Sequence, residues 1–136
     1  MSTAFLKMIG NVQHPLTECY KLPYADFTRH PRQIRVGDLM VLYAVGAGKR
    51  IFALVKVESE VRRVDQEKYP FRLDISYLIN LHPSLGVPIS DITTAKRDLV
   101  RPIQWGLSYF WLHPEEFTLA ESKLKEVDKM LRASKK

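Results

Sequence analysis

The hydrophobic positions along the chain predict a domain built mainly from β-strands. Residues 38–45 form a nearly continuous apolar run, glycines at positions 46 and 48 favour a hairpin turn, and residues 50–61 return as a second strand. In the returning strand, apolar side chains fall on both sides of the pleat, which predicts a strand covered on both faces. After Pro70, apolar residues from Phe71 to Ile79 alternate with polar ones, and this pattern predicts a long, half-exposed strand.

The two ends of the chain predict one further strand and one helix. Residues 4–12 are mostly apolar and favour a buried first strand that stops at the turn of Gly10 and Asn11. Near the C-terminus, Pro114 and two glutamates mark a helix start, and apolar residues recur on one helix face, namely Phe117, Ala120, Leu124, Val127 and Leu131. We expect this face to pack on the sheet and residues 133–136 to fray.

Two connecting segments lack a clear pattern. Residues 14–35 contain three prolines, so they predict at most one short helix, around residues 16–20, before a long loop. Loops of this length inside a domain are usually functional. Residues 93–100 match neither the strand nor the helix pattern clearly, and their conformation stays open.

Length and composition limit the protein to a few classes. The 136 residues suit a single domain, residues 1–136, and the formal net charge of +6 is compatible with a polyanionic partner. The single cysteine, Cys19, excludes an internal disulfide, and the sequence shows neither a signal peptide nor a membrane span. We therefore expect a cytoplasmic protein that does not bind a membrane.

The motifs of common catalytic and metal sites are missing from the sequence. No nucleophile motif surrounds a serine or the cysteine, and the four histidines are too far apart for a zinc site. Residues 46–49 end in Gly-Lys but lack the first glycine and the final Ser or Thr of a phosphate-binding loop. We expect no catalytic residue, no metal and no cofactor, which favours a binding module, although an enzyme without a recognisable motif stays compatible with the sequence.

Basic and aromatic residues occur together around the long loop and the hairpin. Arg29, Arg32 and Arg35 lie in the loop, Arg50 begins the returning strand, and aromatic residues flank these segments. Bases stack on aromatic rings and phosphates pair with arginine, so this combination favours a nucleic acid partner. The alternative is that the charges form a solvated face and that the aromatic side chains fill the core.

Three short motifs follow one another in the order found in a known family. They are Val-Gly-Asp at residues 36–38, Tyr-Pro-Phe-Arg at residues 69–72 and Leu-His-Pro-Glu-Glu-Phe at residues 112–117. In this order the chain resembles the EVE domain, a member of the PUA-like superfamily that also contains the YTH and ASCH domains. The resemblance spans nearly the whole chain and implies an α+β fold, in which a small, curved, partly closed β-barrel carries flanking helices.

The resemblance also implies a function. Relatives bind nucleic acid, and several hold a modified base, flipped out of its strand, in an aromatic-lined pocket. Transferred by position, this base pocket would comprise Gly10, Asn11, Tyr20, Lys21, Tyr24, Tyr43, Trp105 and Ser108. Tyr20 replaces a tryptophan that is common in the family. The phosphate contacts would come from Arg29, Arg32, Arg35 and Arg50.

The leading hypothesis is therefore a non-enzymatic reader of a modified base, more in DNA than in RNA, with any effector supplied by a separate protein. A second hypothesis is an ASCH-like enzyme acting on a modified nucleoside, for which Asp38 and Glu18 are the nearest carboxylates in sequence. A third is a protein-interaction module that uses an apolar patch at residues 105–111. The nature of the modification and the oligomeric state stay open.

Overall fold

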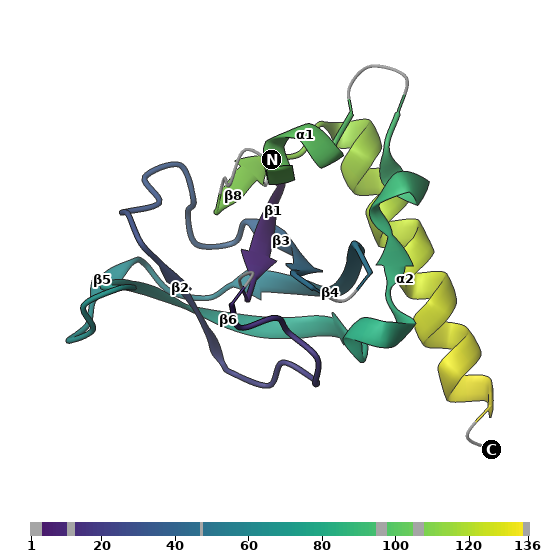
Figure 1. Ribbon diagram of the computed structural model, residues 1–136, viewed down its shortest axis with the longest axis horizontal. Coiled ribbons are helices and arrows are strands. Elements are labelled where there is room, and N and C mark those ends of the chain that lie inside the picture. The colour runs from purple at the N-terminus through teal and green to yellow at the C-terminus, as the bar shows by residue number, and fades with distance from the viewer. Residues whose placement is uncertain (1–3, 11–12, 47, 95–97, 105–107, 135–136) are drawn as a thin grey trace.

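The computed structural model describes residues 4–10, 13–46, 48–94, 98–104 and 108–134. In chain order, with η for a 3₁₀ helix, its elements are β1 (Ala4–Ile9), β2 (Tyr24–Phe27), β3 (Leu39–Ala44), β4 (Arg50–Val57), β5 (Arg62–Arg63), β6 (Phe71–Asn80), η1 (Pro83–Leu85), β7 (Val87–Pro88), η2 (Ile89–Ile92), α1 (Val100–Gln104), β8 (Tyr109–Trp111) and α2 (Pro114–Ser134). Figure 1 shows the long helix α2 running along one side of the strands.

The strands form one mixed sheet in the order β2-β6-β4-β3-β1-β8. Neighbours on this path are antiparallel except β1 and β3, which are parallel. The pairing register shifts between Leu42 and Tyr43 and again between Leu54 and Val55, and such β-bulges bend the strands that carry them. The sheet curls into a half-barrel, and together with α2 it makes the fold α+β.

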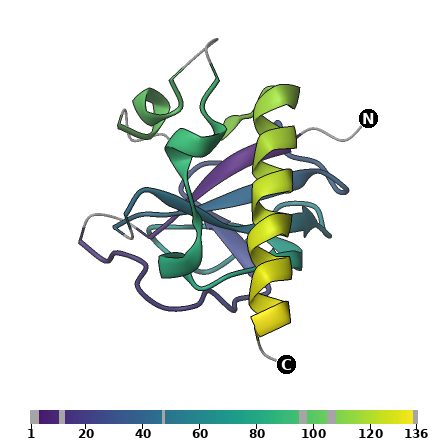
Figure 2. The same ribbon diagram turned by 90° about the vertical axis from the view of Figure 1, so that its right-hand side faces the viewer.

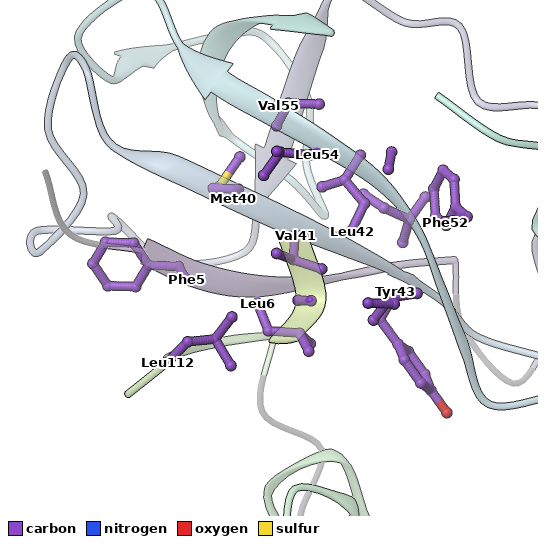
Figure 3. Packing of buried hydrophobic residues seen from close by; sticks show 14 of the residues in the cluster. Phe5, Leu6, Met40, Val41, Leu42, Tyr43, Phe52, Leu54, Val55 and Leu112 are labelled. Carbon is purple, nitrogen blue, oxygen red and sulfur yellow. The ribbon is translucent and has the colours of Figure 1, made fainter. Parts of the chain in front are cut away.

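The core lies on both faces of the two central strands. Residues 40–44 of β3 and residues 51–55 of β4 are all buried, as their continuous apolar runs predicted. Figure 3 shows side chains from three neighbouring strands in this core, among them Phe5, Met40 and Val55. Burying one such side chain stabilises the fold by about 1.5–3 kcal/mol, so this cluster supplies the main driving force for folding.

The C-terminal helix begins where the sequence predicted it. Pro114 is its first residue, and a carboxylate oxygen of Glu116 accepts a hydrogen bond from the backbone N–H of His113 at 2.7 Å. The predicted apolar face packs on the sheet and on η2 through Phe117, Ala120, Leu124, Val127 and Leu131. Figure 2 shows α2 lying across the strands. None of the described helices has an apolar stretch long enough to cross a membrane.

We expect Glu116→Ala to lower the free energy of unfolding by about 2 kcal/mol, because it removes the carboxylate that accepts from the His113 N–H at the helix start. Glu116 itself is fully buried, so the variant also loses packing there. Urea denaturation of the variant measures this effect. Glu126→Ala, an exposed glutamate in the middle of the same helix, is the control and should change stability by less than about 0.5 kcal/mol.

The short helix that the sequence allowed around residues 16–20 is absent. Residues 16–20 are not helical, because the Leu16 N–H donates to the carbonyl of Val45 at 2.9 Å and the carbonyl of Tyr20 accepts from the Asn80 amide at 2.8 Å. The backbone of this segment therefore bonds to other parts of the fold instead of to itself. At the C-terminus, residues 133 and 134, for which fraying was expected, are the last two residues of α2, and the Ser134 hydroxyl donates to the carbonyl of Leu131 at 2.9 Å. Residues 135 and 136 lie outside the described residues.

Candidate functional site

The two edge strands of the curled sheet approach each other at one place. The ring of Phe27, the last residue of β2, meets the ring of Tyr109, the first residue of β8, edge to face at 5.5 Å between centroids. Tyr109 also contacts Phe5 of β1 at 6.0 Å. Because β2 ends at this contact, the long loop that follows it begins beside β8, as Figure 1 shows.

A groove of about 730 Å³ separates this loop from β8. Its volume lies in the range typical of small-ligand sites. One wall carries Thr28, Arg29, His30, Arg32 and Gln33, and the other carries Ser108, Tyr109, Phe110 and Trp111. No lining residue has a carboxylate, and Trp111 is 53% exposed. The groove therefore combines positive charge on one wall with aromatic surface on the other.

A second groove of about 370 Å³ continues the first along the loop. It shares His30 and Arg32 with the first and adds Arg35, and its acidic lining residue is Glu60. The His30 ring also contacts the Phe71 ring of β6 at 5.4 Å. Together the two grooves make a positively charged track along residues 29–35.

Behind the aromatic wall lies a buried lysine, Lys7 of β1, which is 5% exposed. Its ammonium donates to the Ser108 hydroxyl at 3.2 Å and to the carbonyl of Met8 at 3.1 Å, and it lies 4.6 Å from the centre of the Phe27 ring. Burial lowers the pKa of Lys7 to about 8, and the charge of Asp26 opposes part of that shift. Asp26 itself is bound in a bidentate ion pair by Arg72, at 2.7 and 3.1 Å.

The depressed pKa of Lys7 makes stability depend on pH. Its pKa falls from the ordinary 10.5 to about 8 on folding, so between these values the unfolded chain binds more protons and stability rises with pH. We expect a rise of about 1 kcal/mol per unit between pH 8.5 and 9.5, measured by urea denaturation. Lys7→Met should remove the rise. Above pH 10, stability falls with pH instead, because burial raises the pKa of Tyr77 to about 12 and the unfolded chain loses the Tyr77 proton first.

The structure brings four of the sequence-predicted site residues together. Arg29, Arg32 and Ser108 line the first groove, and Arg35 lines the second. This grouping joins two segments that lie far apart in the sequence. Asn11 and Trp105, which were predicted for the base pocket, lie outside the described residues.

Two predicted pocket tyrosines lie in a different cluster, and neither lines the two grooves. The hydroxyl of Tyr20 donates to the carbonyl of Tyr24 at 2.8 Å, and burial raises the pKa of Tyr20 above its ordinary value. The guanidinium of Arg72 lies 3.6 Å from the centre of the Tyr24 ring. The first contact ties the segment before β2 to the start of β2, and the second ties β2 to β6.

The other predicted residues have separate positions. Tyr43 is 5% exposed and belongs to the core, where Figure 3 labels it, and its burial raises its pKa. The Arg50 guanidinium donates to the carbonyl of Gly86 at 2.8 Å, and Lys21 is exposed. Gly10 has a φ of 87°, the left-handed conformation that favours glycine, so it shapes the turn after β1. None of these four residues lines either groove.

Sequence reasoning missed Lys7 and His30 as site residues. Lys7 is the one charged residue in the otherwise apolar strand β1, and this exception could have drawn attention to it in the sequence. His30 precedes a proline in the long loop and gave no sign of an aromatic contact. Among the described residues, no group of three or more His, Cys, Asp or Glu side chains is arranged to hold a metal ion.

Comparison with known proteins identifies structural neighbours only. No protein-family model matches the chain, and no curated protein matches it by sequence. The NMR structure of Rpa0253 from Rhodopseudomonas palustris is 16% identical, with 95% of this chain and 94% of that chain covered and a TM-score of 0.59. The crystal structure of Atu2648 from Agrobacterium tumefaciens is 14% identical, with 95% and 92% covered and a TM-score of 0.57. A hypothetical protein from Leishmania major is 12% identical, with 93% and 96% covered and a TM-score of 0.61. At such low identities, the likeness shows only that the fold recurs in these proteins. It does not indicate a function for this chain.

Proposed function

We propose that the groove between residues 28–33 and β8 binds nucleic acid and reads a modified base. The observation that carries this proposal is the pairing of cationic side chains on one wall, Arg29 and Arg32, with the exposed ring of Trp111 on the other. Phosphate groups pair with cationic side chains, and a base stacks on an aromatic ring. The absence of any carboxylate among the lining residues favours a polyanion further.

The dimensions and the continuation of the groove support the same proposal. A volume of about 730 Å³ is ample for one extruded base. The adjoining groove at Arg35 gives the neighbouring phosphates a path along the loop. Extruding a base costs a few kcal/mol, which stacking on Trp111 and Tyr109 and hydrogen bonds to the Ser108 hydroxyl would recover.

The resemblance to the EVE domain supports a PUA-like assignment of this half-barrel and, with it, a modified base as the ligand. We propose DNA as the leading partner and RNA as the alternative. The modified group would add apolar contact to the aromatic wall, so the modified strand should bind more tightly than the plain one.

An NMR titration with a short single strand tests the location of binding. We expect the backbone amide signals of residues 28–30, 32–36 and 108–111 to shift, because these residues line the two grooves. Signals of residues 121–132 on α2 serve as the internal control, since that helix also carries lysines but lies on another side of the sheet. Shifts confined to α2, or no shifts at all, would refute the proposed site.

A further inference from the structure

Ser108 and Lys7 are held together where β1 pairs with β8. Lys7 lies opposite Tyr109 in antiparallel register, and the Met8 N–H donates to the carbonyl of Ser108 at 2.9 Å. The Lys7 ammonium donates to the Ser108 hydroxyl oxygen at 3.2 Å, although the two residues are 101 positions apart in sequence. Ser108 lines the first groove, whereas Lys7 is buried behind it.

The Lys7 ammonium fixes the direction of this hydrogen bond. An ammonium carries three donors and no acceptor, so the lysine donates and the serine oxygen accepts. In the described part of the chain, the other groups that receive the ammonium are the carbonyl of Met8, at 3.1 Å, and the face of the Phe27 ring, whose centre is 4.6 Å away. With a pKa of about 8, Lys7 is mostly protonated at pH 7, as these contacts require.

The proton of the Ser108 hydroxyl is left without an acceptor. A serine hydroxyl has one proton to donate, and its oxygen already accepts from Lys7. Among the described residues, no group accepts a hydrogen bond from this hydroxyl. Because the positive charge of the ammonium also polarises it, the hydroxyl is a stronger donor than an isolated serine would be. Ser108 therefore presents a donor of fixed direction at the wall of the groove.

A ligand atom that meets this donor has to be an acceptor. The charged side chains on the opposite wall, Arg29 and Arg32, are donors as well, and no lining residue has a carboxylate. On a base, the acceptors are carbonyl oxygens and unprotonated ring nitrogens, and the donors are its amino groups. An amino group at Ser108 would bring two donors face to face, which costs binding free energy because neither is satisfied.

We propose that Ser108 reads the identity of the base by donating a hydrogen bond to one acceptor atom on its edge, and that Lys7 is the positioning residue that fixes this direction. The inference rests on the proposed function and gives Ser108 and Trp111 different roles. Ser108 selects the base, and the aromatic wall at Trp111 selects the modified group. Ser108→Ala should therefore weaken the binding of plain and modified strands equally, by about three- to tenfold, and preserve the preference between them.

Strands with small changes in the target base test the donor role of Ser108. Starting from the strand that binds the wild type most tightly, each acceptor of the base is replaced in turn, a ring nitrogen by C–H or a carbonyl oxygen by sulfur. Fluorescence anisotropy should show that one replacement weakens binding to the wild type by about three- to tenfold and has no effect on Ser108→Ala. Removing an amino group of the base should affect both proteins equally. Ser76→Ala, which removes an exposed hydroxyl on β6, is the control and should behave as the wild type does.

The positioning role of Lys7 has its own variant and its own signal. In Lys7→Met the hydroxyl is free to rotate, so the effect of the acceptor replacement should fall below about twofold, because the donor is no longer preorganised. Lys56→Met, at an exposed lysine on β4, is the matched control and should keep the full effect. Urea denaturation checks that each variant is folded. In the unbound wild type at pH 7, nitrogen NMR should show the Lys7 side chain as an ammonium coupled to three protons.

Four results would overturn parts of this account. Ser108 is not the donor if every acceptor replacement weakens the wild type and Ser108→Ala equally, or if the effect of removing an amino group disappears in Ser108→Ala. Lys7 does not fix the direction if Lys7→Met keeps the full acceptor effect, or if the NMR signal is that of a neutral amine. A wild type that binds no strand would refute the proposed function itself, whereas strand binding that does not depend on Ser108 would refute this inference alone.

Discussion

Replacing Arg29 and Arg32 together by alanine is expected to weaken binding of a short nucleic acid strand by about ten- to a hundredfold at low salt. Both side chains line the first groove, and Arg32 also lines the second. Log affinity falls as log salt rises, and each lost phosphate contact makes this slope shallower by about 0.7 for a single strand. Fluorescence anisotropy at several salt concentrations measures both the affinity and this slope, which should fall by about 1.4 for two contacts.

The matched control removes two positive charges elsewhere. Lys125→Ala with Arg132→Ala changes the net charge equally but acts on α2, where these side chains pair with Glu121 and Asp128. At about 0.1 M salt we expect its affinity to stay within about threefold of the wild type, because the Debye length is then about 10 Å and charges on another side of the sheet are screened. Equal losses in the two double variants would mean that net charge, and not the groove, holds the strand.

Trp111→Ala is expected to weaken binding of a strand by about five- to a hundredfold, because stacking on one aromatic ring contributes about 1–3 kcal/mol per base. Stability should change little, since Trp111 is 53% exposed and its ring meets the ring of His113 edge to face at 5.9 Å between centroids. Anisotropy gives the affinity, and thermal unfolding gives the stability of the same sample.

Two further variants serve as controls for Trp111→Ala. Trp111→Phe keeps an aromatic face and should recover most of the affinity. Met130→Ala removes an exposed apolar side chain on α2, which is 65% exposed, and should have no effect on binding. If Trp111→Ala binds as the wild type does, the aromatic wall does not stack on the base, and the proposed way of reading the ligand fails.

Regular patterns made much of the fold predictable. Alternation over residues 71–79 identified β6, and the recurrence of apolar residues after Pro114 identified α2 and its buried face. The hairpin between β3 and β4 followed from its glycines, of which Gly46 and Gly48 have positive φ angles. These features depend on neighbours close in sequence, which is why they could be predicted locally.

The sequence did not specify the conformation where distant contacts decide it. The segment at Leu16 bonds to the β3–β4 hairpin, and no local pattern contains that information. The same limit applies to the candidate site. Arginines of the long loop could be recognised as a basic group, but their position opposite β8 depends on the curl that brings Phe27 to Tyr109. The contact of Lys7 with Ser108 requires strands from opposite ends of the chain to pair.

The central claim is that the groove reads a modified base in a nucleic acid strand. The most direct measurement is anisotropy binding to matched short DNA and RNA strands, plain or carrying methylated or hydroxymethylated cytosine or methylated adenine, at two salt concentrations. Our account predicts that one modified strand binds more tightly than its plain counterpart, and that Trp111→Ala removes this preference. Equal binding to every strand, modified or not, would contradict it.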